Sequence, residues 1–212
     1  MPQQAQDDFL ARGRRRVLTP GQRLFSRGDK ADGMFRVLEC SARVSNVSRT
    51  GQETVLDYYG PGAWFGEVSA IDGLPRVHDA RAHESATVLH LTTSDLDDLM
   101  ILHPVLSRAL LRLQALRLRL LLVALETYSA QSMEQRLANR LLMLAISFGV
   151  ATTKGLKIKL HLPQETLAQL IGATRQGVNQ ILKKWEAEGT IGQRYGRILL
   201  LDQARLEKLA QD

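Results

Sequence analysis

The stretch PQETLAQLIGATRQGVNQILKKW, residues 163–185, decides how the C-terminal part of the chain folds. Pro163 suits the start of a helix, Gly172 suits the left-handed position that ends it, and Thr174 can cap a second helix. Apolar residues recur at helical spacing on both sides of the glycine, at Leu167, Ala168, Ile171, Val178, Ile181, Leu182 and Trp185. A small residue, a turn glycine and an apolar residue at the crossing are typical of a helix-turn-helix. The alternative is a chance pair of helices with the same residues.

The second helix of this motif carries polar side chains on its outward face. They begin at its cap and comprise Thr174, Arg175, Gln176, Asn179, Gln180, Lys183 and Lys184. In a helix-turn-helix the first residues of the second helix reach base edges in the major groove. Arginine fits guanine, and glutamine or asparagine fits adenine, whereas the two lysines further along are expected to contact phosphate. The sequence therefore predicts an interface with double-stranded DNA on this helix.

A hairpin is expected after Gly189. The segment GQRYGR, residues 192–197, precedes the apolar run Ile198–Leu201, and this pattern indicates a wing of two short strands. Arg194 and Arg197 are candidates for contacts with phosphate or with the minor groove. The alternative is that these charges form only a solvated face, and the adjacent motif favours the contact.

The positive charge of the chain is concentrated in its second half. Among 212 residues, 28 Lys and Arg outnumber 22 Asp and Glu, which gives a formal net charge of +6. Residues 1–103 have a net charge of −2, residues 104–131 of +3 and residues 132–212 of +5. A slightly acidic front and a basic back indicate two modules, of which the second meets a polyanion.

Several classes of protein are excluded by the composition. The single cysteine, Cys40, excludes an intramolecular disulfide framework and a zinc or iron–sulfur site held by several cysteines of one chain. The longest apolar run, Leu120–Leu125, is too short for a bilayer, and Met1–Leu10 lacks the apolar core of a secretory signal. No nucleophile–base pair, metal constellation or NTPase phosphate loop is recognisable. We therefore expect a cytoplasmic protein that is not an enzyme, binds no metal and contacts no membrane.

Short strands between glycines fill residues 16–92. They are expected at Val17–Leu18, Leu24–Phe25, Met34–Leu38, Ala42–Val47, Thr54–Tyr59 and Ala86–Leu91. Such strands, with turns about every ten residues, are typical of an antiparallel sandwich or barrel.

Helical periodicity begins after residue 92. Thr93 or Ser94 can cap a helix that runs through Met100. A further amphipathic helix is expected at Met133–Phe148, followed by a polar connection at Ala151–Gly155.

Between these, a long helix is expected to begin at Pro104. It has two apolar stripes, one with Leu111, Ala115, Leu118, Leu122 and Leu125, the other with Ala109, Leu113, Leu116, Leu120 and Val123. A helix with two apolar stripes must bury two faces. One face can lie on the β-rich domain, and we expect the other to pack against the same helix of a second chain as a parallel coiled coil. The alternative is that one chain covers both faces.

A β-rich domain, a long helix and a winged helix-turn-helix together resemble the Crp/Fnr family of bacterial transcription regulators. The resemblance implies an α+β fold with an N-terminal antiparallel β-roll at residues 1–103, a dimerisation helix at 104–131 and a DNA-binding domain at 132–212. It also implies a homodimer on an inverted-repeat operator of double-stranded DNA, and it leaves RNA polymerase as a further candidate partner.

A second motif carries the resemblance: FGEVSAIDGLPRVHDARA, residues 65–82, is similar to the phosphate-binding cassette of cyclic-nucleotide domains. Gly66 lets backbone amides approach an anion, and a short helix from Glu67 can aim its first amides at a phosphate. In cyclic-nucleotide binders the glutamate accepts a hydrogen bond from the ribose 2′-hydroxyl and the arginine, here Arg76, pairs with the phosphate. The resemblance implies an effector site at Gly66, Glu67, Val68, Arg76 and Val77, with cyclic AMP or another cyclic nucleotide as the candidate effector.

The sequence departs from the family pattern around this cassette. Val77 stands where the family often has Ser, Thr or Ala, and His78 and Asp79 follow where small or apolar residues are usual. Cys40 stands where the family usually has a turn glycine.

Two further departures lie on the long helix. Leu121 and Leu122 occupy the positions at which hydroxyl residues of the cyclic-AMP receptor contact adenine, and they argue against that mode of adenine reading. Two alternatives stay open for Glu67 and Arg76: a cyclic-nucleotide site, or a structural ion pair or capping contact in an empty roll.

The function expected from these features is that of a dimeric, sequence-specific transcription regulator controlled by a small effector in the roll. Gln180 stands where the cyclic-AMP receptor has an arginine that reads guanine, and Gln176 replaces a carboxylate, so the inner operator bases are expected to differ. The alternative is a cyclic-nucleotide-binding regulatory module that acts on a protein partner.

Overall fold

The computed structural model describes residues 3–48, 53–128 and 130–211, and of residues 123–128 only the backbone. The chain divides into two compact units, Met1–Ala124 and Leu125–Asp212. Each unit buries its own set of apolar side chains.

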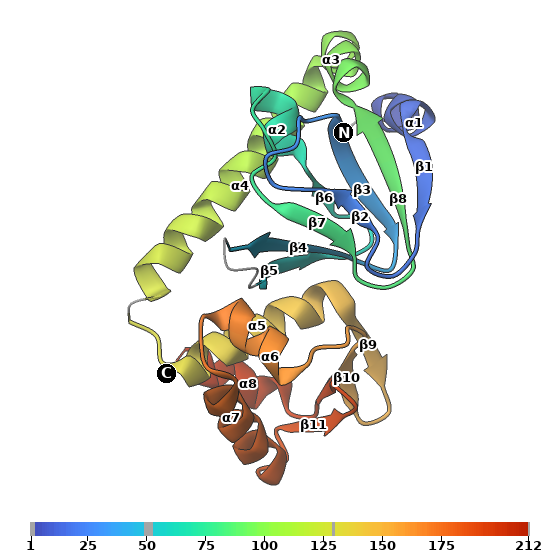
Figure 1. Ribbon diagram of the computed structural model, residues 1–212. Coiled ribbons are helices and arrows are strands. Elements are labelled where there is room, and N and C mark those ends of the chain that lie inside the picture. Colours follow the sequence, from blue (N-terminus) through green and yellow to red (C-terminus); the bar gives the residue numbers. More distant parts are fainter. Residues whose placement is uncertain (1–2, 49–52, 129, 212) are drawn as a thin grey trace. The chain divides into compact units, whose positions relative to one another are not determined.

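The first unit contains eight described strands. Their bounds are β1 Arg14–Leu18, β2 Arg23–Phe25, β3 Gly33–Glu39, β4 Ala42–Val47, β5 Glu53–Tyr59, β6 Trp64–Phe65, β7 Asp79–Ala82 and β8 Ala86–Thr92. They pair antiparallel in two four-stranded sheets, with the orders β1-β8-β3-β6 and β2-β7-β4-β5, which form a β-roll (Figure 1). The antiparallel β-roll predicted from the sequence is confirmed.

Aromatic rings and small residues fill the interior of the roll. Phe35 is fully buried, and its ring centroid lies 5.5 Å from that of Phe65 and 5.7 Å from that of Phe25. Ala80 and Ala82 of β7 leave room for these rings. A fully buried side chain of this size stabilises a fold by about 1.5–3 kcal/mol, so the rings hold the two sheets together.

Four helices complete the first unit: α1 Gln3–Arg12, α2 Glu67–Asp72, α3 Thr93–Leu102 and α4 Pro104–Tyr128. The predicted cap of α3 is wrong by one residue, because Thr92 and not Thr93 or Ser94 caps this helix. The Thr92 hydroxyl accepts a hydrogen bond from the Asp95 amide at 3.1 Å, which is possible because Thr92 keeps an extended backbone.

Helix α4 buries apolar side chains against the roll along its first turns, and Gln114 and Arg117 continue the contact further along the helix. Leu106 and Leu110 are buried in the core that α3 shares with β3 and β8. Further along the helix, leucines of both predicted stripes are more than half exposed in the single chain, namely Leu111, Leu116, Leu118, Leu120 and Leu122. The side chains of Val123 and Leu125, the last members of the stripes, lie outside the described residues.

No single helix in the described ranges is long and apolar enough to cross a bilayer. Only α3 and the Pro104–Leu122 part of α4, taken together, reach that length and hydropathy, and they are bent by 116°.

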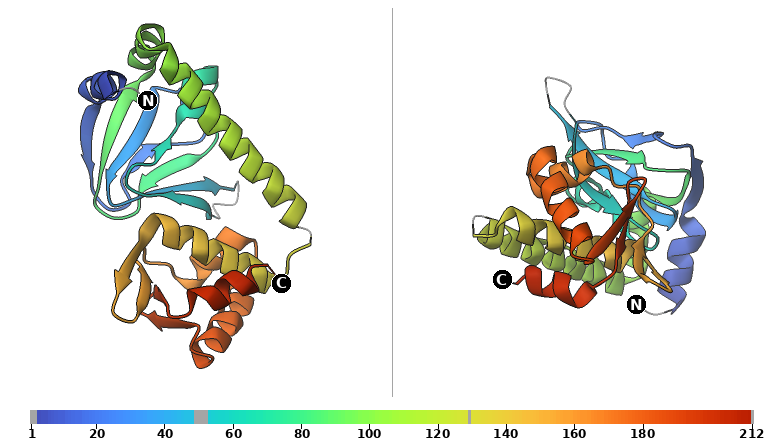
Figure 2. Two further views of the ribbon diagram at one scale, coloured as in Figure 1. Left: turned by 180° about the vertical axis from the view of Figure 1, so that it is seen from behind. Right: turned by 90° about the horizontal axis from the view of Figure 1, so that it is seen from below.

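The second unit combines four helices with a four-stranded sheet in its described part. Figure 2 shows the ribbon from two further sides. Its elements are α5 Met133–Phe148, β9 Gly149–Thr152, β10 Gly155–Ile158, α6 Gln164–Ile171, α7 Arg175–Ala187, β11 Ile191–Arg194, β12 Arg197–Leu200 and α8 Gln203–Leu209. The sheet has the order β11-β12-β10-β9, and β11 and β12 form the predicted wing. The predicted polar connection at Ala151–Gly155 is wrong, because these residues form the β9–β10 hairpin. The alternation of apolar and polar residues that begins with Leu156, Lys157 and Ile158 is the signal that could have identified β10.

Candidate nucleic-acid interface and effector cradle

The turn between α6 and α7 has the geometry that its residues predict. Gly172 ends α6 in the left-handed region with φ 61°, and its amide donates back to the last turn of the helix. The Thr174 hydroxyl accepts a hydrogen bond from the Gly177 amide at 3.1 Å and caps α7. Val178, Leu182 and Trp185 are fully buried, which fixes the outward face of α7 on the opposite side. The predicted helix-turn-helix is confirmed.

Polar side chains are exposed along this outward face. Arg175, Gln176, Gln180 and Lys183 are all exposed, and none of them has a hydrogen bond or ion pair with another described residue. Side-chain donors and acceptors that the protein itself does not use are available to base edges and phosphates.

Two other predicted contact residues of α7 are bound within the unit. Asn179 is half-buried, and its Oδ1 accepts a hydrogen bond from Gln164 Nε2 of α6 at 3.0 Å, which orients its amide. Lys184 Nζ donates to both carboxylate oxygens of Glu134, at 2.9 and 3.1 Å. Sequence reasoning missed Glu134, because it lies on α5, fifty residues before Lys184.

The contact between Glu134 and Lys184 shifts the pKa of both groups. Hydrogen bonding to the Glu134 carboxylate raises the pKa of Lys184. Burial on its own raises the pKa of Glu134, but the hydrogen bonds from Lys184 and Trp185 outweigh burial, and the pKa of Glu134 lies below its ordinary value of 4.5. Both groups are therefore charged near neutral pH.

The tip of the wing is a two-residue turn. Tyr195 and Gly196 have positive φ angles of 50° and 68°, as a tight hairpin turn of this kind requires at both central positions. Tyr195 is 85% exposed, and the guanidinium of Arg194 lies 5.5 Å from its ring centroid. Arg197 Nη1 makes only a long contact of 3.5 Å with the Lys159 carbonyl. Both predicted arginines thus stand at the tip of the wing without a strong internal partner among the described residues.

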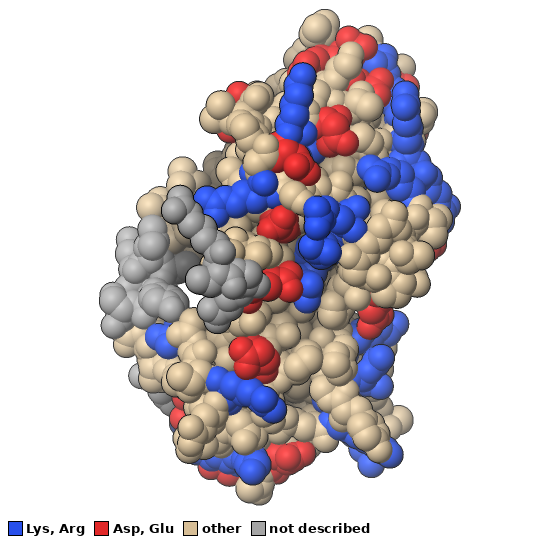
Figure 3. Space-filling model, in the orientation of Figure 1, with Lys and Arg blue, Asp and Glu red and all other residues tan. Residues whose placement is uncertain are grey.

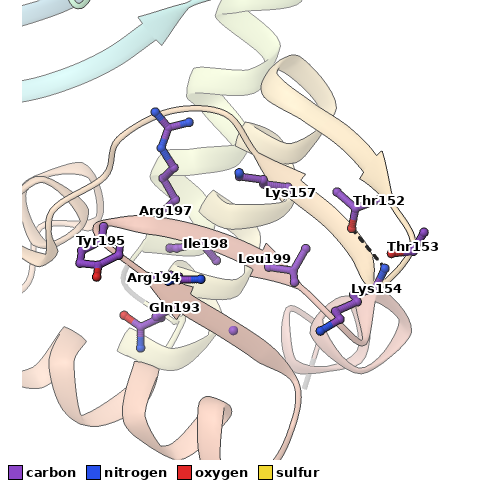
Figure 4. A pocket seen from close by; sticks show the side chains of 11 residues that line it. Thr152, Thr153, Lys154, Lys157, Gln193, Arg194, Tyr195, Arg197, Ile198 and Leu199 are labelled. Atoms are coloured by element: carbon purple, nitrogen blue, oxygen red, sulfur yellow. Dashed lines mark hydrogen bonds between the residues drawn. The ribbon is translucent and has the colours of Figure 1, made fainter.

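A basic cleft of about 490 Å³ opens on the outer face of the wing sheet. Its eleven lining residues include four cations and no acid, and Figure 4 shows these side chains around the strands: Lys154, Lys157, Arg194 and Arg197. Figure 3 shows basic side chains gathered over this sheet, at the lower right. A second cavity of about 530 Å³, which reaches Arg175 at the start of α7, shares Arg197 with the basic cleft. The lining of this cavity includes Arg175 and Arg197 and also one acid, Glu165, so the two cavities connect the start of α7 with the wing through Arg197.

In the first unit, Gly66 and Arg76 form the centre of the predicted effector cradle. Gly66 has φ 79°, and a side-chain carbon placed there would lie 2.9 Å from Arg76 Nη1. The Arg76 side chain is 1% exposed, and its Nη1 donates to the Gly66 carbonyl at 2.7 Å. Its Nη2 donates to the Gly33 carbonyl at 2.6 Å and to Asp32 Oδ1 at 2.7 Å. The guanidinium also lies over the ring of Phe25, 4.3 Å from its centroid.

Glu67, the second charged residue of the cradle, is fully buried and bound from α4, which runs past α2 in Figure 1. Its Oε1 accepts hydrogen bonds from Arg117 Nη1 and, at 3.0 Å, from Gln114 Nε2. Arg117 Nη2 also donates to the Trp64 carbonyl at 2.5 Å. Glu67 Oε2 is buried without a partner among the described residues. Glu67 and Arg76 therefore have separate protein partners, and sequence reasoning missed those on α4 because they are far away in the chain.

The remaining residues of the predicted effector site lie at the surface of the single chain. Val68 and Val77 are 42% and 49% exposed, and Leu121 and Leu122 of α4 are 56% and 52% exposed. In the described part of the chain, no cluster of three His, Cys, Asp or Glu residues is placed to hold a metal ion.

The unusual residues beside the cassette have structural partners. His78 Nδ1 lies 3.1 Å from Asn46 Oδ1, and Asp79 Oδ1 accepts a hydrogen bond from the Arg27 amide at 3.2 Å. His90 stacks on Phe35 with centroids 4.6 Å apart, and burial lowers the pKa of His90 more than the nearby Asp32 carboxylate raises it. Asp32 therefore has Arg76 as its charged partner in the cradle at neutral pH.

The turn position of Cys40 has the geometry that a glycine usually supplies. Cys40 is exposed and has φ 61°, in the left-handed region. A residue with a side chain pays about 1–2 kcal/mol there, so the fold keeps this turn despite the substitution.

Comparisons with known proteins identify both units. Residues 15–103 match the cyclic nucleotide-binding domain family, and residues 135–209 match the Crp-like helix-turn-helix domain family. A Mycobacterium tuberculosis (strain ATCC 25618 / H37Rv) protein named CRP-like cAMP-activated global transcriptional regulator is 29% identical over 191 residues, which are 90% of this chain and 85% of that protein. The global nitrogen regulator of Synechocystis sp. (strain ATCC 27184 / PCC 6803 / Kazusa) is 31% identical over 163 residues, covering 75% of this chain and 72% of that protein. A solved CRP-family transcriptional regulator from Thermus thermophilus matches with a TM-score of 0.76 and 26% identity, over 93% of this chain and 97% of that chain.

Proposed function

Because this chain belongs to the Crp/Fnr family of transcription regulators, we propose that it binds a specific inverted-repeat DNA sequence as a homodimer. The observation that carries this proposal is the outward face of α7, where Arg175, Gln176, Gln180 and Lys183 are exposed and not bonded to other described residues. Arginine and glutamine at the start of a recognition helix read guanine and adenine in the major groove.

The wing extends this interface to the DNA backbone. The basic cleft, with Lys154, Lys157, Arg194 and Arg197 and no acid in its lining, matches the negative charge of a phosphate backbone beside the major groove. In this proposal α7 reads the bases, and Arg194 and Arg197 contact phosphate.

Selection of bound sequences from a random DNA pool tests the proposal. We expect an enriched inverted repeat with half-sites about one DNA turn apart. The double variant Gln176→Ala/Gln180→Ala is expected to change the enriched inner bases. If the wild type enriches no sequence, the proposal is wrong, and a regulatory module that acts on a protein partner becomes the better description.

The homodimer is proposed from α4. Six of its leucines are more than half exposed, namely Leu111, Leu116, Leu118, Leu120, Leu121 and Leu122. A row of exposed leucines along one helix suits a parallel coiled coil with a second copy. We propose residues 104–131 as the dimerisation helix between an effector-sensing part, 1–103, and a DNA-binding part, 132–212. Light scattering is expected to show a dimer for the wild type and a monomer for Leu118→Glu. Arg119→Glu is the control, since it places the same carboxylate at the neighbouring position, with an even larger change in charge, without removing a leucine. A dimeric Leu118→Glu would contradict the proposal.

For the effector we propose a cyclic nucleotide in the cradle. Glu67 Oε2 is buried and lacks a partner among the described residues, so it can accept a ribose hydroxyl. Asp32 is 54% exposed on its side chain, which makes it the partner of Arg76 that a cyclic phosphate can replace most easily.

Calorimetry with cyclic AMP and with cyclic GMP tests this effector. We expect binding by the wild type and tighter binding by Asp32→Asn, because this variant removes the carboxylate that competes for Arg76. Absence of heat with either nucleotide at near-millimolar concentration would contradict the proposal.

A further inference from the structure

An ion pair joins the first turn of α5 to the recognition helix α7. The Glu134 carboxylate accepts two hydrogen bonds from Lys184 Nζ, at 2.9 and 3.1 Å, and one from Trp185 Nε1, at 2.8 Å. The side chains of Glu134 and Lys184 are 28% and 51% exposed, so the pair lies at the edge of the DNA-binding unit and not in its core.

Glu134 is fixed in place independently of Lys184. Trp185 is fully buried, and its indole N–H holds the carboxylate. The residues on either side of Glu134 are also held: Ser132 and Gln135 form a reciprocal capping box. Met133 packs against Gly177 so closely that a side-chain carbon at the glycine would lie 2.7 Å from its Sδ. The carboxylate is therefore a preformed acceptor beside α7.

Lys183 and Lys184 are adjacent, but their ammonium groups differ. Lys183 is exposed and has no ion pair with another described residue. Lys184 has three N–H donors, and two hydrogen bonds of its ammonium group are directed at Glu134. A phosphate and the Glu134 carboxylate compete for the same group, since both are anions that accept from an ammonium.

We propose that Glu134 withholds Lys184 from the DNA backbone and so lowers the affinity of the recognition helix for DNA of any sequence. This inference rests on the proposed DNA-binding function. Glu134 is a positioning residue, because it acts through Lys184 and touches no base. Lys183 contributes to the electrostatic attraction of DNA, and Lys184 does not as long as Glu134 is charged.

The salt dependence of DNA binding tests the proposal. Glu134→Gln keeps an acceptor for Trp185 and removes the charge that holds Lys184. We expect this variant to bind both operator and unrelated DNA more tightly, with a salt slope steeper by about 0.9, the value for one added phosphate contact. The ratio of the DNA affinity of Glu134→Gln to that of the wild type is expected to fall about threefold between 50 and 200 mM salt.

Four further variants, one of them a control, separate release of Lys184 from a general change in charge. Lys184→Met is expected to leave the wild-type slope unchanged, whereas Lys183→Met is expected to reduce it by about 0.9. In Glu134→Gln/Lys184→Met the slope is expected to return to the wild-type value. Glu186→Gln is the matched control, because it removes the same charge from the end of α7 while its Oε1 can still accept from the Gln193 amide.

The outcomes distinguish this inference from the function on which it rests. If the wild type binds DNA and Glu134→Gln shows the same slope, the inference is overturned and the function stands. If the wild type binds no DNA, both fall. Should Glu134→Gln fail to fold, Lys184→Met alone decides, since a slope reduced by about 0.9 in that variant overturns the inference and an unchanged slope supports it.

Discussion

The charged side chains of the effector cradle and of the recognition helix have opposite surroundings. Arg76 and Glu67 are buried, and backbone carbonyls, Asp32, Gln114 and Arg117 bind all of their charged ends except Glu67 Oε2 and Arg76 Nε. On α7 the guanidinium of Arg175 and the ammonium of Lys183 are exposed and not bonded to other described residues.

The burial of an arginine in this protein indicates whether its charge serves mainly the stability of the fold or the binding of a partner. A buried charge must be paired by the protein, so Arg76 first contributes to the stability of the roll, and a ligand has to take over contacts that already exist. An exposed charge contributes almost nothing to folding stability. Arg175 is therefore expected to contribute to the affinity for DNA and not to the stability of the fold.

The largest effect is expected from Arg76→Met, which tests the cradle side of this comparison. The variant leaves the Gly66 and Gly33 carbonyls without their donor, and each orphaned buried acceptor costs about 1–3 kcal/mol. Urea unfolding measures the loss of stability. Arg119→Met on the exposed face of α4 is the control, and an Arg76→Met loss as small as that of the control would break the comparison.

The next effect belongs to Arg175→Ala, at the start of α7. We expect its DNA affinity to fall by about 1–3 kcal/mol, with relaxed preference at one base of each half-site. Its stability should change by less than about 0.5 kcal/mol, as for other exposed positions. Fluorescence anisotropy with the selected operator and urea unfolding measure the two quantities. An unchanged base preference would count against base reading by Arg175.

A smaller effect is expected from Arg197→Ala in the basic cleft. Loss of one phosphate contact is expected to flatten the salt slope of DNA binding by about 0.9. It is also expected to lower the affinity for all DNA sequences by the same factor. Because the contact of Arg197 with the Lys159 carbonyl is 3.5 Å long, stability should stay within about 0.5 kcal/mol of the wild type. If the variant instead changes the preference at one operator base and leaves the salt slope of DNA binding unchanged, Arg197 reads a base.

The smallest effect is expected from Glu134 of α5. Its ion pair with Lys184 makes Lys184 a charged residue of α7 that already has a partner within the protein, as Arg76 has in the cradle. Because the folded-state pKa of Glu134 lies below 4.5, its charge stabilises the second unit above pH 4.5. This stabilisation is lost as the pH falls through the folded-state pKa, when the carboxyl becomes protonated. The stability difference between wild type and Glu134→Gln should therefore shrink as the pH falls below 4.5 in thermal unfolding. A difference that does not depend on pH would contradict this assignment.

Local patterns predicted much of the fold and of the DNA interface. The αL glycine Gly172, the cap at Thr174 and the apolar spacing through Trp185 act within a few residues of one another, so the sequence contains all the information they need. The strands β6 and β7 were missed because two and four residues are too few to show an alternation.

Long-range partners could not be predicted in this way. Arg117 lies fifty residues from Glu67, Asp32 lies forty-four from Arg76, and Lys184 lies fifty from Glu134. Each of these pairs depends on how two elements pack, and no spacing rule links such residues. The sequence thus indicated which residues carry charge, and packing decided which of those charges are already used.

The pairing of β1 with β8 also sets the order in which the protein can assemble. Arg14 to Leu18 pair with Ala86 to His90, so the outer strand of the roll has no partner until the last strand has been synthesised. In the second unit, β9 pairs with β10 and β11 with β12 over short distances along the chain, and local pairings form quickly. The two hairpins then join where Leu156 pairs with Leu200, which is a shorter separation than that between β1 and β8. The half of the chain that leaves the ribosome first therefore depends on the more distant contacts. Three consecutive arginines, Arg14 to Arg16, charge this strand, and charged side chains on an unpaired strand disfavour pairing with another chain.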